Sequence, residues 1–232
     1  RAVLDYARQK GVAATFYDEV GFPSGSADKS IPARYYRKLL QREDTTVSAG
    51  QTYSLDLASG DRPVAIVALD TPSGKRVDVL ASAKNDQIEW KAPPGNWRVQ
   101  RYSVQTASAS ASFIDYYGVA DYMDPEASRW FIENSYARAQ KGLADHFGTT
   151  IKFGFFDDVG VYSDEKTWNP SIAERFVKIT RKPAALYYPA LWDEIGPETA
   201  AARVGFFKAR SELLGETFPK LVTEWSHAHN LR

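Results

Sequence analysis

The sequence has 232 residues, 44% of them hydrophobic, which is enough to bury a sizeable core in one or two domains. Its formal net charge is zero, so composition gives no electrostatic reason to expect nucleic acid or an anionic membrane as a partner. The lack of cysteine excludes disulfides and a thiol nucleophile, and no apolar stretch is long enough to cross a bilayer.

The two ends predict an internal fragment of a longer protein. Residues 1–10 are typical of the last turns of a helix that Gly11 ends, and residues 224–232 are typical of a helix before a further strand. The sequence starts without Met or a signal peptide, so it gives no localisation.

Residues 12–18 predict an apolar strand, buried on both faces, that ends in Asp18 and Glu19 before a turn rich in Gly, Pro and Ser. Because strand side chains alternate, one acid should face a site while the other supports it. Glu19 reaches further, and burial among aromatic neighbours would raise its pKa toward that of a useful general acid. The alternative is that one of the two carboxylates caps the following turn.

The next part of the chain changes character. Residues 31–40 predict a short helix or a connecting arm. Short alternating stretches then follow, with the strongest strands at residues 63–70 and 97–104 and turn signals between them. This pattern predicts an inserted antiparallel, sandwich-like β module at residues 45–112, which ends in a small, polar link.

Beyond the link, the pattern returns to alternating helices and strands. Asp124-Pro125-Glu126 predicts a helix start, and residues 151–156 predict a second apolar strand. Asn169-Pro170 begins another helix, and a helical region at residues 197–227 is interrupted near Gly215 and Pro219. We therefore expect an α/β fold, a partial (β/α)8 TIM barrel formed by residues 1–44 and 113–232, because a closed barrel needs about 250 residues.

The second predicted strand also ends in two acids, Asp157 and Asp158. Adjacent carboxylates at a buried strand end are costly unless a cation, a substrate or a shared proton relieves them; a solvated loop is the alternative. Paired with Glu19, they would suit glycoside hydrolysis. Carboxyls about 6.5–9.5 Å apart would invert the anomeric centre and carboxyls about 5–5.5 Å apart would retain it, and the sequence does not choose between them.

Three further residues are assigned to substrate binding. Asp18 supports Glu19, its partner in the first acid pair. Asp121 precedes the helix predicted at Pro125, and the alternative for it is an ordinary role in a turn. Trp168 is either a platform on which a sugar ring stacks or a core anchor for the helix at Pro170.

These residues resemble glycoside hydrolase family 106, the bacterial α-L-rhamnosidases. The resemblance rests on Tyr17-Asp18-Glu19 with Pro23-Ser24-Gly25, on Pro93-Pro94-Gly95-Asn96-Trp97, on residues 121–127 and on Phe156-Asp157-Asp158-Val159. These motifs follow the family's order over nearly the whole chain. Two positions depart from it: Asp158-Val159 replaces a Glu-Pro pair, and Asp28 replaces a Gly.

The resemblance implies a (β/α)8 barrel and hydrolysis of a terminal α-L-rhamnosyl linkage with inversion. It also implies an oligosaccharide or glycan substrate, calcium at the sugar, and export to the periplasm or beyond. Glu19 would be a catalytic acid or base, and Asp157 and Asp158 would be site carboxylates.

Two other functions stay open. One is a carbohydrate-binding relative that has lost turnover through the change at Asp158. The other is a metal-dependent hydrolase or lyase in which Asp18, Asp157 and Asp158 bind calcium or magnesium. The three histidines, His146, His227 and His229, are too few and too clustered to predict a zinc site.

Overall fold

The computed structural model describes residues 1–18, 24–25, 30–60, 62–106, 120–156 and 166–232. The chain divides into two compact units, one of residues 1–37, 106–164 and 212–232 and the other of residues 38–105 and 165–211. The domain boundaries predicted near residues 44 and 112 stay a prediction, because these units are defined by packing and not by independent folding.

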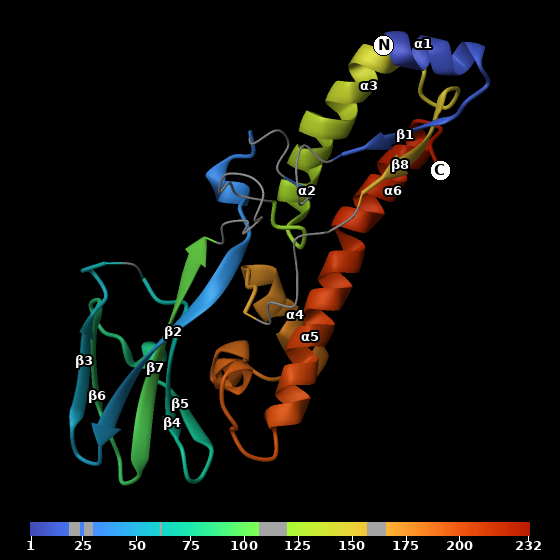
Figure 1. Ribbon diagram of the computed structural model, residues 1–232. Coiled ribbons are helices and arrows are strands. Elements are labelled where there is room, and N and C mark those ends of the chain that lie inside the picture. The colour runs from blue at the N-terminus through green and yellow to red at the C-terminus, as the bar shows by residue number, and fades with distance from the viewer. Residues whose placement is uncertain (19–23, 26–29, 61, 107–119, 157–165) are drawn as a thin grey trace. The chain divides into compact units, whose positions relative to one another are not determined.

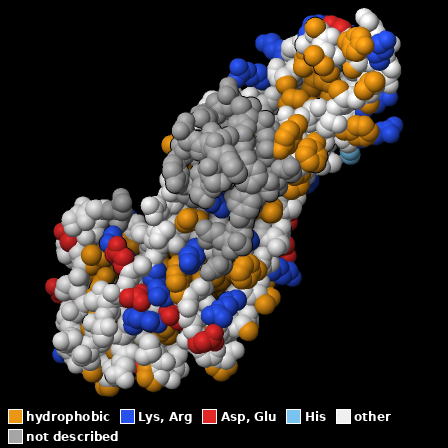
Figure 2. Space-filling view, viewed as in Figure 1, with side chains coloured by type: hydrophobic (Ala, Val, Ile, Leu, Met, Phe, Trp, Pro, Cys, Tyr) orange, Lys and Arg blue, Asp and Glu red, His pale blue; other side chains and the backbone are white. Residues whose placement is uncertain are grey.

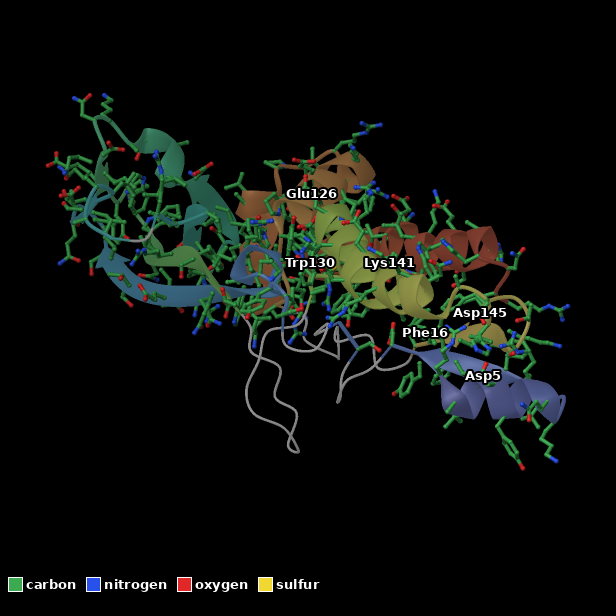
Figure 3. All side chains as sticks on the ribbon, turned by 90° about the horizontal axis from the view of Figure 1, so that it is seen from above. Asp5, Phe16, Glu126, Trp130, Lys141 and Asp145 are labelled. Atoms are coloured by element: carbon green, nitrogen blue, oxygen red, sulfur yellow. The ribbon has the colours of Figure 1, made fainter. Side chains whose placement is uncertain are left out.

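The first unit packs helices against one parallel pair of strands. Strand β1 pairs with β8, and Phe16 lies opposite Gly154 (Figure 1). Its described elements are α1 (Ala2–Gln9), β1 (Ala14–Tyr17), η1 (Ala33–Tyr35), α2 (Pro125–Ile132), η3 (Glu133–Ala137), α3 (Arg138–Leu143), β8 (Ile151–Phe155) and α6 (Phe218–Ala228). Elements α2, η3 and α3 follow one another without a break, and Glu126, Trp130 and Lys141 mark their course in Figure 3.

The prediction of a partial TIM barrel is wrong. In the part of the chain that the structure describes, β1–β8 is the one parallel sheet, and it has two strands. The predicted burial of the first strand on both faces is also wrong, because Tyr17 of β1 is 44% exposed; Phe155 of the paired strand β8 is 47% exposed. Their rings lie 5.2 Å apart, and apolar side chains gather on the face of this unit seen in Figure 2.

The absence of further parallel strands has a local cause after residue 166. Residues 184–191 are strongly apolar but form a 3-10 helix, η4 (Ala184–Leu191). Pro183 precedes it and Pro189 lies inside it, and neither can donate a backbone hydrogen bond to a sheet. The described chain that follows Pro170 is therefore helical, where a barrel would return to strands.

The second unit contains a four-stranded sheet of order β2-β7-β4-β5 and a two-stranded sheet of β3 and β6 (Figure 1). β4 pairs antiparallel with β5 and β7, and β3 pairs antiparallel with β6, as the alternating pattern predicted. The strands are β2 (Lys38–Ser48), β3 (Thr52–Asp56), β4 (Ala65–Asp70), β5 (Lys75–Asp78), β6 (Gln87–Lys91) and β7 (Asn96–Thr106), with η2 (Leu80–Ser82) between β5 and β6. Ile66, Ile88 and Trp97 belong to the core between the two sheets.

The sheet begins earlier than predicted. Residues 31–40 were expected to form a short helix or an arm; the 3-10 helix η1 lies within them, but β2 already starts at Lys38. The backbone N–H of Leu40 donates to the carbonyl of Lys166 at 2.8 Å, and Leu39 pairs with Thr167. This long-range pairing overrides the local propensity of a leucine-rich segment.

The predicted helix starts are confirmed where a side chain caps them. Asp124 accepts a hydrogen bond from the backbone of Glu126 at 2.8 Å, and Asn169 accepts one from Ile172 at 3.1 Å. These caps begin α2 and α4 (Pro170–Thr180). The break in the C-terminal helical region, expected near Gly215 and Pro219, lies at Thr217, between α5 (Thr199–Glu216) and α6.

One glycine in α5 tests the packing of the second unit. A Cβ on Gly205 would lie 2.8 Å from Thr180 Cγ2 and 2.9 Å from Phe176 Cε2, whose ring stacks on Phe206 at 4.0 Å. We expect Gly205→Ala to lower the free energy of unfolding by about 1–3 kcal/mol through overpacking, measured by urea denaturation. The matched control is Gly142→Ala in α3, where a Cβ meets nothing within 4 Å. This control should gain up to about 1 kcal/mol from helix propensity, and equal effects of the two changes would contradict the packing.

Candidate functional site

Strand β1 delivers a buried acid to the interior of the first unit. Phe16 and Asp18 are two residues apart and therefore point to the same side of the chain. Phe16 packs on Tyr136 with ring centroids 5.0 Å apart, and Asp18, just past the strand end, is only 5% exposed. Figure 3 shows Phe16 on β1. The apolar strand thus carries its terminal carboxylate into a protein environment, as an acid with a chemical role would require.

Two hydroxyl groups hold the Asp18 carboxylate. The Tyr136 hydroxyl donates to Oδ2 at 2.5 Å, and the Ser24 hydroxyl donates to Oδ1 at 2.7 Å. Hydrogen bonds of this kind stabilise an ionised carboxylate and fix its orientation. Burial, followed by the charge of Asp18, raises the pKa of Tyr136 far above its ordinary value, so Tyr136 stays protonated and acts as a donor.

A second tyrosine positions Ser24. The hydroxyl of Tyr122 donates to the carbonyl oxygen of Ser24. Gly25, the next residue, has a φ of +103°, and a Cβ there would overlap the Tyr122 hydroxyl. Only glycine therefore suits this turn, for backbone and steric reasons together.

Tyr136 reaches Asp18 because the helix widens. η3 is a π-helical turn between α2 and α3. Within it, Asn134 donates to the carbonyl of Trp130 at 2.8 Å, and Ser135 donates to that of Phe131 at 2.6 Å. The extra residue of a π turn shifts the helical phase, and such turns occur often at functional sites. Tyr136 is fully buried as a result.

Asp121 belongs to the same interior. It is 2% exposed, its Oδ1 accepts from the backbone of Met123 at 3.1 Å, and its own N–H donates to the carbonyl of Tyr35 at 2.8 Å. Its neighbour Tyr122 binds Ser24, which in turn binds Asp18. Asp18 and Asp121 are therefore both buried in the first unit, and the described hydrogen bonds of Asp121 serve the turn before α2.

Of the remaining predicted site residues, the structure describes one. Trp168 lies in the second unit, where its indole N–H donates to the Tyr188 hydroxyl at 2.8 Å. Glu19, Asp157 and Asp158, with Asp28, lie outside the described residues. Their predicted roles stay predictions.

Sequence reasoning missed the residues that hold Asp18. A regular helix with a period of 3.6 residues that buries Phe131 would bring residues 134, 135 and 138 to the same face, but Arg138 is exposed and Tyr136 is buried. The π turn shifts the helical phase, so that Tyr136 is buried in place of Arg138. No local sequence pattern predicts such a turn. Ser24 was part of the recognised turn, but its bond to Asp18 depends on the tertiary fold.

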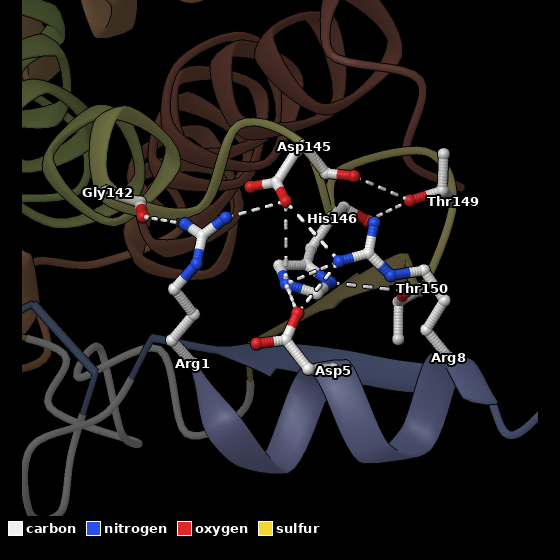
Figure 4. Close-up of polar contacts among 8 residues, drawn as sticks. All are labelled: Arg1, Asp5, Arg8, Gly142, Asp145, His146, Thr149 and Thr150. Atoms are coloured by element: carbon white, nitrogen blue, oxygen red, sulfur yellow. Dashed lines mark hydrogen bonds and ion pairs between the residues drawn. The ribbon is translucent and has the colours of Figure 1, made fainter. Parts of the chain in front are cut away.

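A second polar cluster surrounds a buried histidine (Figure 4). His146 is 0% exposed, its Nε2 lies 3.2 Å from Asp5 Oδ1, and its Nδ1 lies 3.2 Å from the Thr150 hydroxyl. Arg8 donates to Asp5 at 2.8 Å and thereby lowers the pKa of that carboxyl. The groups of the cluster bind one another and fasten α1 to the turn after α3, so we assign it a structural role.

The described residues do not by themselves form a calcium site. Among them, no three His, Asp or Glu side chains gather in a way that could hold a metal ion. Asp18, the one predicted calcium ligand that the structure describes, accepts hydrogen bonds from Ser24 and Tyr136. In the same described ranges, every helix is too short or too polar to span a membrane.

Comparison with known proteins gives a match at the level of structure. No family model matches the sequence, and no curated protein matches it. The structure is similar to that of a rhamnosidase from Novosphingobium sp. PP1Y, with a TM-score of 0.52 and 22% sequence identity over 72% of this chain. The match spans 17% of the rhamnosidase chain. The described fold is therefore similar to one part of a much larger glycosidase.

The hydrogen bond from Tyr136 to Asp18 can be tested by its contribution to stability. We expect Tyr136→Phe to keep the ring contacts with Phe16 but to lower the free energy of unfolding by about 1.5–3 kcal/mol, because a donor to a buried charged group is lost. Urea denaturation followed by tryptophan fluorescence measures this change. Tyr6→Phe, at a position 61% exposed, is the control and should have no effect. Equal unfolding free energies for wild type and Tyr136→Phe would contradict the role given to Tyr136.

Proposed function

We propose that this chain belongs to a glycoside hydrolase that cleaves terminal α-L-rhamnosyl linkages and is related to glycoside hydrolase family 106. The observation that carries the proposal is the similarity of 72% of the chain to part of a rhamnosidase structure. The sequence motifs that resemble family 106 also support it, because they depend on particular residues and not on the fold. A structural match at 22% identity supports the fold and not the activity. The activity is therefore our inference.

Glu19 and one of Asp157 and Asp158 are the proposed acid/base pair. One carboxylic acid gives its proton to the glycosidic oxygen as the bond to the anomeric carbon breaks. The other carboxylate takes a proton from water, whose oxygen forms the new bond from the opposite face. The products are the free sugar, with inverted configuration, and the alcohol of the leaving group.

Asp18 has a distinct role in this scheme. The hydroxyls of Ser24 and Tyr136 stabilise its ionised form, at 2.7 Å and 2.5 Å. A negative charge on the residue before Glu19 disfavours the ionisation of Glu19 and so favours its acidic form. Because Asp18 and Asp121 are 5% and 2% exposed, the proposal gives them the role of positioning groups around the substrate site and not of accepting sugar hydroxyls themselves.

Trp168 is the proposed stacking surface for a sugar ring. Its indole N–H is fixed by Tyr188, which orients the aromatic plane. An indole held in this way can present its face to the C–H groups of a pyranose without losing further side-chain freedom on binding.

A second candidate function is glycan binding without turnover. The specific observation in its favour is Asp158-Val159, which stands where family 106 tends to have Glu-Pro. Catalytic groups must be held within about half an ångström of their working geometry, and this change alters both reach and backbone.

The catalytic proposal is tested on the longest natural protein that contains these 232 residues. We expect Glu19→Gln to lower kcat on 4-nitrophenyl α-L-rhamnopyranoside by about 10²–10⁴-fold, because general acid or base catalysis is lost. Glu126→Gln, an exposed position in α2, is the control and should keep full activity. Proton NMR of the first product formed shows whether the anomeric centre is inverted. Wild-type protein that binds rhamnosides but does not hydrolyse them would establish the second candidate instead.

Calcium at the sugar is part of the same proposal and has its own test. We expect EDTA to lower rhamnosidase activity severalfold, and added calcium, but not magnesium, to restore it, because calcium accepts the irregular oxygen set of a sugar more readily. Unchanged activity after removal of bound metal, verified by elemental analysis, would show that calcium is not needed while leaving the acid/base pair in place.

A further inference from the structure

The second unit contains a groove that the proposed chemistry does not use. It is an open groove of about 660 Å³, lined by residues of β2 and β3, by Gln51 between these strands and by Arg101 of β7. This volume is within the range of small-molecule sites in proteins. β2 is one of the two edge strands of the four-stranded sheet, and β3 belongs to the two-stranded sheet. The groove therefore lies where the chain passes from one sheet to the other.

The lining is polar, with one aromatic ring. Hydroxyl and amide side chains dominate it, among them Thr45, Gln51 and Ser54. Tyr53 is the aromatic member, half-buried, and it also packs against the core between the sheets. One side of the tyrosine is thus fixed by the core while the residue lines the groove.

A carboxylate, Glu43, and a guanidinium, Arg101, line the groove together with this tyrosine. Arg101 donates to Glu43 at 3.2 Å, and both side chains line the groove. Burial raises the pKa of Tyr53, while the charge of Arg101 lowers it and that of Glu43 raises it, so both charges act on the phenol. The Glu43 side chain is 69% exposed and that of Arg101 is 26% exposed, which leaves the acid accessible to a ligand.

We propose that this groove binds a neutral glycan, with the Tyr53 ring against a sugar face and Glu43 and Arg101 hydrogen-bonded to its hydroxyls. A sugar presents C–H groups on one face and hydroxyls around its rim, which matches an aromatic ring framed by a donor and an acceptor. The choice of rhamnose as the sugar rests on the proposed function. The groove itself, and its preference for polyhydroxyl ligands, do not depend on it.

Other ligand classes fit the lining less well. An anionic ligand would meet Glu43 and a cationic one would meet Arg101, so the ion pair favours a neutral molecule. An extended peptide would pair with an edge strand but would also need pockets for alternate side chains. Val47 and Leu55 are the aliphatic lining residues, and Val47 is only 4% exposed.

The test is binding of methyl α-L-rhamnopyranoside to the full-length protein, measured by isothermal titration calorimetry and saturation-transfer NMR. We expect Tyr53→Ala to weaken binding in the groove about tenfold, and Tyr53→Phe to keep most of it because the ring remains. Glu43→Gln should weaken binding by severalfold because an ionised acceptor is lost. Tyr6→Ala, at an exposed tyrosine of α1, is the matched control and should bind like wild type.

The outcomes separate this proposal from the catalytic one. Loss of binding in Tyr53→Ala with rhamnosidase turnover unchanged on the aryl substrate establishes the groove, and it does so even if no turnover exists in any variant. Binding that is equal in wild type, Tyr53→Ala and Glu43→Gln overturns the groove, whatever the activity. Preference for an unrelated extended peptide over the sugar overturns it as well.

Discussion

The burial of one carboxylate is the constraint on which the first unit depends. Asp18 is only 5% exposed, and an unpaired buried charge costs several kcal/mol. Two hydroxyl donors offset that cost, one of them close to Asp18 in the sequence and the other far from it. Tyr136 is 118 residues from Asp18, and Ser24 is six residues away, beyond the strand end. The position of the helix α2–η3–α3 against β1 is therefore set by a polar contact as well as by apolar packing.

The same contact continues into the C-terminal helices. Tyr122 donates to the carbonyl of Ser24, and its ring lies 4.5 Å from that of Phe218. Its backbone carbonyl accepts the hydroxyl of Thr217, the residue between α5 and α6. The break between these helices thus has a polar partner in addition to the effect of Pro219. One chain of hydrogen bonds joins the acid after β1 to the start of α6.

The sequence predicted the features that local chemistry decides. Asp124 and Asn169 were identified as helix caps because a cap acts within two or three residues. The partial barrel was wrong because apolar strands were taken as one arc of a parallel barrel sheet, although Tyr17 and Phe155 are exposed and the proline-containing residues 184–191 form a 3-10 helix. Tyr136 could not be predicted, since the phase shift of a π turn depends on tertiary packing. Asp18 was singled out by its position at a strand end, but its two donors were not.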